Sequence, residues 1–150
     1  MESIHPIVVH FPIALLLAAL LLETLALFLK KPGWHAFSLV NLCLGVLGAG
    51  GAVLTGQWAE AAAKHSFEIY QLMELHEKIG KGVFCAALTV ALVRLAMKDR
   101  LKGWLRWAAW AALAAACGAM AFGAHLGGRL VYEFGVGGSY GKSGGIQVVR

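Results

Sequence analysis

Charged side chains are scarce in this chain of 150 residues: Asp, Glu, Lys and Arg make up 14% of it, whereas hydrophobic residues make up 59%. Soluble domains average about 25% charged and roughly 45–50% apolar residues. This shortage of charge excludes an ordinary soluble enzyme and a disordered segment, and the mean hydropathy of +0.71 indicates an integral membrane protein. The net charge of +5 does not indicate nucleic-acid binding here, because basic residues beside membrane spans orient the protein.

Cysteine is also rare, and its three copies stand apart at Cys43, Cys85 and Cys117. The chain has no C-x-x-C pair, which excludes a covalently attached c-type haem and a cysteine-ligated iron–sulfur cluster. It also excludes a secreted disulfide scaffold, which needs many paired cysteines. Single cysteines in apolar stretches usually act as small hydrophobic residues.

Long apolar stretches are what the sequence has in abundance. Each approaches the roughly 20 residues that a helix needs to cross about 30 Å of hydrocarbon, where the backbone finds no other hydrogen-bond partner. The four stretches are 7–29, 36–58, 79–97 and 104–125. They predict an all-α fold, a four-helix transmembrane bundle.

The rest of the chain is expected to lie outside the spans. Residues 1–132 form the predicted membrane domain, and residues 133–150 form a glycine-rich outer tail whose glycine spacing fits no nucleotide-binding motif. The longest connection between spans is the expected loop from Ala59 to Lys78.

Basic residues gather in two of the three connections between spans. Six basic residues stand there, with Asp99 as the one acidic residue on that side: Lys30, Lys31, Lys98, Arg100, Lys102 and Arg106. Arg94 is expected to reach the same side by snorkelling. On the opposite side the positive and negative charges balance. Because cytoplasmic loops carry the excess of Lys and Arg, we expect both termini on the outer, periplasmic side of a bacterial inner membrane.

Histidines fall mainly on the expected outer side: His5, His10, His65, His76 and His125. The sixth, His35, is expected in a cytoplasmic loop. His10, His76 and His125 share one depth near the outer membrane surface, and an ionisable residue at such depth is a functional candidate. His5 and His65 fit an ordinary interfacial position equally well.

Imidazole is the usual axial ligand of haem and a common metal ligand. The candidate cofactor-binding residues are therefore His10, His76, His125 and His65, with Arg129 four residues after His125 near the expected propionates. The leading interpretation is haem b. A copper or zinc ion, held by the same histidines with Glu74 or Glu77 nearby, is the alternative.

These expectations favour a small b-type cytochrome-like protein that exchanges electrons with an outer redox protein or a quinone. An accessory or structural subunit of a larger membrane complex and a copper- or zinc-binding protein are the alternatives. An electron-transfer or binding protein fits better than a stand-alone enzyme. Association into a homo-oligomer or a larger complex stays open.

One acidic residue, Glu23, falls inside the first apolar stretch. About 20 Å of helical rise separates it from His10, so it belongs to the other half of the bundle. It is expected to pair with Arg94 or to accept a hydrogen bond from Asn41, and a place in a proton path is the less favoured interpretation.

Two motifs at the ends of the chain and one in its middle resemble a known family. They are HPIVVHFPIAL at residues 5–15, LGGRLVYEFGVG at residues 126–137, and Leu75-His76-Glu77. They are similar to those of domain-of-unknown-function family 2231, small bacterial membrane proteins. The resemblance implies a four-span bundle and gives His10, His76 and His125 motif positions. Many members carry a histidine where this chain has Phe134, so that ligand is absent here.

Overall fold

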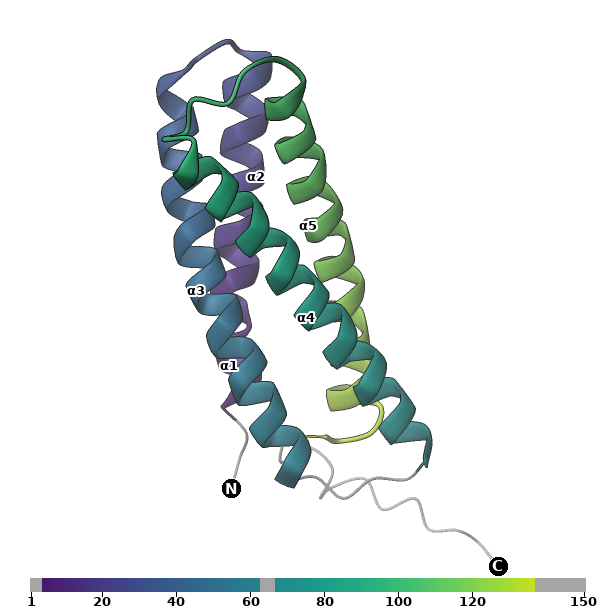
Figure 1. Ribbon diagram of the computed structural model, residues 1–150. Coiled ribbons are helices and arrows are strands. Elements are labelled where there is room, and N and C mark those ends of the chain that lie inside the picture. The colour runs from purple at the N-terminus through teal and green to yellow at the C-terminus, as the bar shows by residue number, and fades with distance from the viewer. Residues whose placement is uncertain (1–3, 63–66, 137–150) are drawn as a thin grey trace, which may run out of the picture.

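The computed structural model describes residues 4–62 and 67–136, which form a bundle of helices (Figure 1). The helices are α1 (His5–Val8), α2 (His10–Phe28), α3 (Gly33–Ala62), α4 (Phe67–Ala96) and α5 (Gly103–Tyr132). α1 and α2 make one span, because Val9 between them keeps helical backbone angles of −64° and −25°. Pro12 has no N–H to give to the carbonyl of Val8, so the helical ladder lacks one bond there.

In the part of the chain that the structure describes, four helical segments are long and apolar enough to cross a membrane: 5–28, 33–60, 67–96 and 103–132. The prediction of an all-α bundle with four spans is confirmed. The turns at residues 29–32 and 97–102 lie at one end of the bundle, which we call the basic end (Figure 1). The start of α1 and the end of α5 lie at the other end, which we call the histidine end.

The prediction of a loop from Ala59 to Lys78 is wrong for most of that range. α3 continues to Ala62 and α4 already begins at Phe67. Ion pairs one turn apart, Glu74 with Lys78 at 2.6 Å and Glu77 with Lys81 at 2.7 Å, support the first half of α4. Hydropathy marks where a helix enters lipid, so it cannot show a helix that continues into water.

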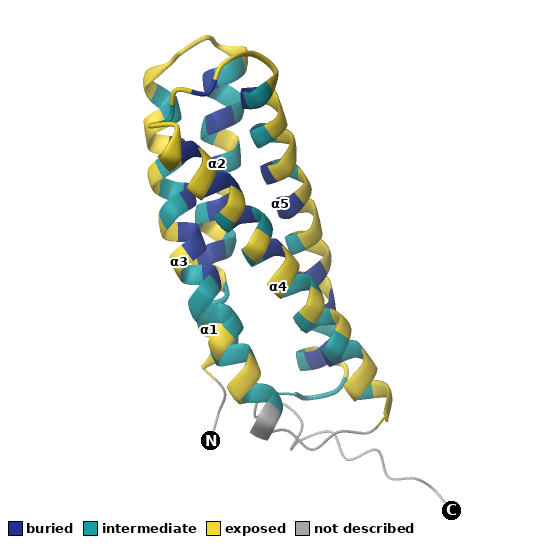
Figure 2. Cartoon of the chain, viewed as in Figure 1, coloured by how far each residue is buried: buried dark blue, intermediate teal, exposed yellow. Residues whose placement is uncertain are grey.

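Close helix packing fills the half of the bundle nearer the basic end, where most buried positions gather (Figure 2). A Cβ atom added to Gly45 of α3 would lie 2.8 Å from the side chain of Leu16 on α2. Closer to the histidine end, a Cβ atom added to Gly48 would lie 3.3 Å from Pro12. Small residues let helices approach in lipid, so these glycines serve packing. Around the histidine end, half-buried positions prevail (Figure 2).

Candidate cofactor-binding cavity

A cavity of about 400 Å³ lies at the histidine end, between side chains of all five helices. Most of its walls are apolar, among them Val9, Ile13 and Val53. Three histidines line it from three different helices: His5 of α1, His10 of α2 and His76 of α4. An apolar cavity of this size with a few convergent polar groups is the usual form of a small-ligand site.

His76 is held in a defined orientation. Its Nδ1 lies 2.9 Å from the backbone carbonyl oxygen of Gly123 on α5. A carbonyl oxygen only accepts, so Nδ1 carries a proton, and Nε2 is the ring nitrogen that carries the lone pair in the neutral form. A Cβ atom on Gly127 would lie 3.0 Å from Cε1 of this ring. A glycine at 127 therefore makes the space in which the imidazole sits.

His10 has the same tautomer for the same reason. Its Nδ1 donates to the carbonyl oxygen of Pro6, one turn earlier, at 2.6 Å. The side chain is exposed, and it is one of the residues that line the cavity. Ligating histidines almost always donate their other ring N–H to a carbonyl or carboxylate, and both His10 and His76 meet this condition.

His5 is the residue whose role the sequence left open. Its Nδ1 lies 3.1 Å from the hydroxyl oxygen of Thr55, and a Cβ atom on Gly56 would lie 3.1 Å from its ring. The rings of His5 and His76 are perpendicular, with centroids 6.2 Å apart. The contact of His5 with the second span has a signal in the sequence. Thr55, a polar residue, is followed by Gly56 at the depth of His5.

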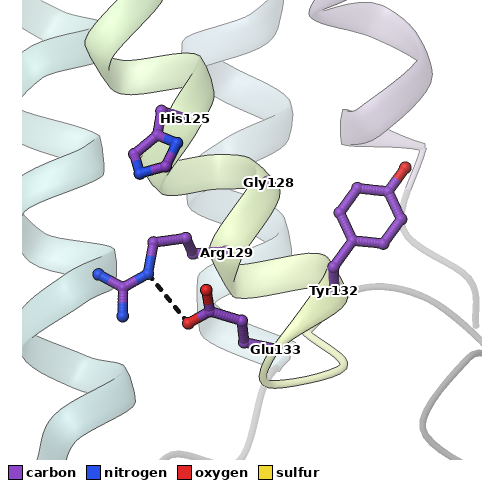
Figure 3. Close-up of a pocket in the computed structure, with 5 residues that line it drawn as sticks. All are labelled: His125, Gly128, Arg129, Tyr132 and Glu133. Carbon is purple, nitrogen blue, oxygen red and sulfur yellow. Dashed lines mark hydrogen bonds and ion pairs between the residues drawn. The ribbon is translucent and has the colours of Figure 1, made fainter.

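His125 and Arg129 do not line this cavity. They border a more open hollow of about 280 Å³ on α5, together with Gly128, Tyr132 and Glu133. Figure 3 shows His125 and Arg129 on one flank of α5 and Tyr132 on the other. Arg129 donates from Nε to Glu133 at 2.9 Å. The structure thus places His5, His10 and His76 on the wall of one cavity and leaves His125 outside it; His65 lies outside the described residues.

The charged residues that line the cavity are acidic. Glu60 of α3 and Glu77 of α4 belong to its wall, whereas none of its described lining residues is Lys or Arg. Glu77 is paired with Lys81 at 2.7 Å. Within residues 4–62 and 67–136 no three His, Cys, Asp or Glu side chains are close enough to form a metal site by themselves.

A second polar cluster, at the basic end, joins all four spans. Glu23 of α2 lies 3.1 Å from Nη1 of Arg94 and 3.0 Å from Nη1 of Arg106, and these three side chains are buried. Asp99 accepts hydrogen bonds from both arginines, at 2.9 and 3.3 Å. His35 Nδ1 lies 3.0 Å from Glu23.

The expected pairing of Glu23 with Arg94 is confirmed, and Asn41 instead donates to the carbonyl of Phe37. The expectation that Arg94 snorkels to the surface is wrong, since its side chain is buried among the helices. His35 was expected in a loop, but it lies in the first turn of α3 and faces Glu23. The pairing of Glu23 with Arg106 also has a signal in the sequence, namely opposite charges at the same depth on different spans.

The glycine beside His76 gives a direct test of the cavity's packing. Gly127→Ala is expected to lower the free energy of unfolding by about 1–3 kcal/mol, because the new methyl group must displace the imidazole ring. Gly118→Ala on the same helix is the matched control, as no atom lies within 4 Å of its added Cβ. Thermal unfolding of the purified protein in detergent measures both, and equal stabilities would contradict this packing.

Comparison with protein families finds one family model, described as "Predicted membrane protein (DUF2231)", which matches residues 1–139. The match covers all four spans and both polar clusters. No curated protein and no solved structure matches the chain. The family description supports the membrane location, and the chemistry must be inferred from the residues themselves.

Proposed function

The chain belongs to the DUF2231 family of predicted membrane proteins, and we propose that it is a small b-type cytochrome-like protein that binds one haem in the cavity at the histidine end. The observation that carries the proposal is the pair His10 and His76. The two come from different helices, line one apolar cavity, and both hold Nδ1–H on a backbone carbonyl. Each therefore offers an Nε2 lone pair, as an axial ligand requires.

The residues of the cavity fit such a group. Haem would supply a one-electron redox couple. His76 and His10 would hold its iron, and Gly127 leaves the space that His76 occupies. Apolar walls such as Ile13 and Val83 keep water away, which lowers the local dielectric and sets the redox potential.

The haem propionates would need a place away from the negative charges of the cavity. Its charged lining, Glu60 and Glu77, is acidic and repels carboxylates. Tyr132 and Gly128 border both this cavity and the hollow that contains Arg129. In this proposal Arg129 stays near the edge of the cavity, and His125 is not a ligand.

A bound copper or zinc ion is the second candidate, and the acidic lining favours it. Carboxylates next to imidazoles suit a divalent cation, and Glu77 directly follows His76. The size of the cavity favours haem, because a single ion does not fill about 400 Å³.

The absorption spectrum of the purified full-length protein tests the proposal. Protein made in cells supplied with haem should show a Soret band, and an α band should appear on reduction. Haem and metal content are measured on the same sample. A colourless protein overturns the proposal, and copper or zinc in one-to-one ratio without haem would establish the second candidate.

The same proposal places the cavity on the periplasmic side of a bacterial inner membrane, where the haem would exchange electrons with an outer redox protein or a quinone. Cysteine labelling in intact cells tests this orientation, in a variant that lacks Cys43, Cys85 and Cys117. An impermeant maleimide should label a cysteine at position 132, at the end of α5, and should leave one at position 102 unlabelled. Labelling at 102 alone would reverse the orientation.

A further inference from the structure

The basic end carries five exposed cationic side chains, which so far have served only to orient the protein in the membrane. They lie in or beside the turn between α2 and α3 and the turn between α4 and α5, and we call them the basic rim: Lys30, Lys31, Lys98, Arg100 and Lys102. Both turns lie at one end of the bundle (Figure 1). Contacts inside the bundle hold them together, since Arg94 of α4 donates to the backbone carbonyl of His35 in α3 at 2.8 Å.

The basic rim has no acidic partner in the described part of the chain. The acids at this end are Glu23 and Asp99, and both are bound to Arg94 and Arg106. Two carboxylates and two guanidinium groups balance within that cluster. The five charges of the basic rim are therefore left for an anion outside the protein.

Tryptophans place the basic rim at a definite level of the membrane. Four of the five tryptophans of the chain stand near this end: Trp34, Trp104, Trp107 and Trp110. Trp104 is 78% exposed and Trp107 is 45% exposed. Tryptophan is enriched at the level of lipid headgroups, and the rim residues lie immediately beyond the apolar helices in the same turns.

We propose that the basic rim binds the phosphate headgroups of anionic phospholipids in the adjacent leaflet. Clusters of four to eight Lys or Arg residues directly beyond a membrane span attract anionic lipids. A soluble polyanion would have to reach side chains at the headgroup level, where lipid phosphates are already present. The inference does not depend on haem binding at the opposite end.

Lipid quenching of tryptophan fluorescence tests the proposal with reporters that the protein already has. The full chain carrying Trp58→Phe, which removes the tryptophan at the other end, is placed in phosphatidylcholine nanodiscs. A minor fraction of the lipid is brominated, either as phosphatidylglycerol or as phosphatidylcholine. Because one basic residue near an anionic lipid gives about a fivefold preference, brominated phosphatidylglycerol should quench severalfold more efficiently.

Two variants and salt make the test specific. Replacing the five rim residues by glutamine should abolish the preference, whereas Lys78→Gln with Lys81→Gln at the histidine end should leave it unchanged. Raising the salt concentration should weaken the preference of the unaltered rim. Equal quenching by both lipids, a preference that salt does not lower, or one that survives in the glutamine variant would overturn the proposal.

Discussion

Replacing His76 with alanine is expected to reduce bound haem at least tenfold in the purified protein. His76 lines the cavity, and because Nδ1 donates to the carbonyl oxygen of Gly123, Nε2 is the ring nitrogen left to bind iron. Losing a group that merely orients a ligand already costs about 10–100-fold in metal affinity, so losing the ligand itself should cost no less. The haem-to-protein ratio is measured by the pyridine haemochrome method.

His125→Ala is the matched control for this experiment. His125 is also a histidine near the histidine end, but it is exposed and borders only the hollow on α5. It should keep the full haem content. Circular dichroism and thermal unfolding show whether each variant is folded. Full haem in folded His76→Ala protein, or equal loss in both variants, would contradict the assignment of ligands.

Glu23→Ala is expected to have the largest effect on stability, with a loss of about 3–5 kcal/mol in the free energy of unfolding. The substitution leaves Arg94 and Arg106 buried with only Asp99 to balance them. An uncompensated charge is costly in a region of low dielectric, and more so within a membrane. Unfolding in mixed micelles with increasing denaturing detergent measures the change.

Glu74→Ala provides the comparison, because Glu74 pairs with Lys78 at 2.6 Å while both side chains are exposed. Exposed ion pairs contribute about 0–1 kcal/mol. Glu23→Ala protein that stays folded should retain its haem, since the altered cluster lies at the other end of the bundle. Similar losses for both substitutions would show that the buried cluster does not hold the helices together.

The depth of a residue in this protein was predictable from sequence, but the direction in which it points was not. Hydropathy gave all four spans, and it placed His10, His76 and His125 near one end. It could not show that His125 lies on a different flank of the bundle. In lipid the outward faces of helices are as apolar as the inward faces, so the usual alternation that marks a buried face is weak.

The cluster around Glu23 shows what charge patterns add to depth. A charged residue within the apolar region, such as Glu23, needs a partner of opposite charge. Arg94 was predictable as that partner because it lies at a matching depth in another span. His35 was assigned to a loop because the predicted span began at residue 36, whereas α3 begins at Gly33. Arg106 was counted with the loop charges although it lies inside the predicted span 104–125, and it belongs to α5. Helix ends, and therefore the partners that they carry, depend on contacts between distant segments.

The reduction potential of the bound haem in a His10→Met variant tests the central claim most directly. Methionine in place of an axial histidine raises the potential, within the roughly 0.8 V range that axial ligands set. The account predicts a clear rise in potential and an altered spectrum for His10→Met, while His125→Met keeps the potential and spectrum of the unaltered protein. A haem whose potential and spectrum do not change in His10→Met would show that His10 does not ligate it, and would contradict the account.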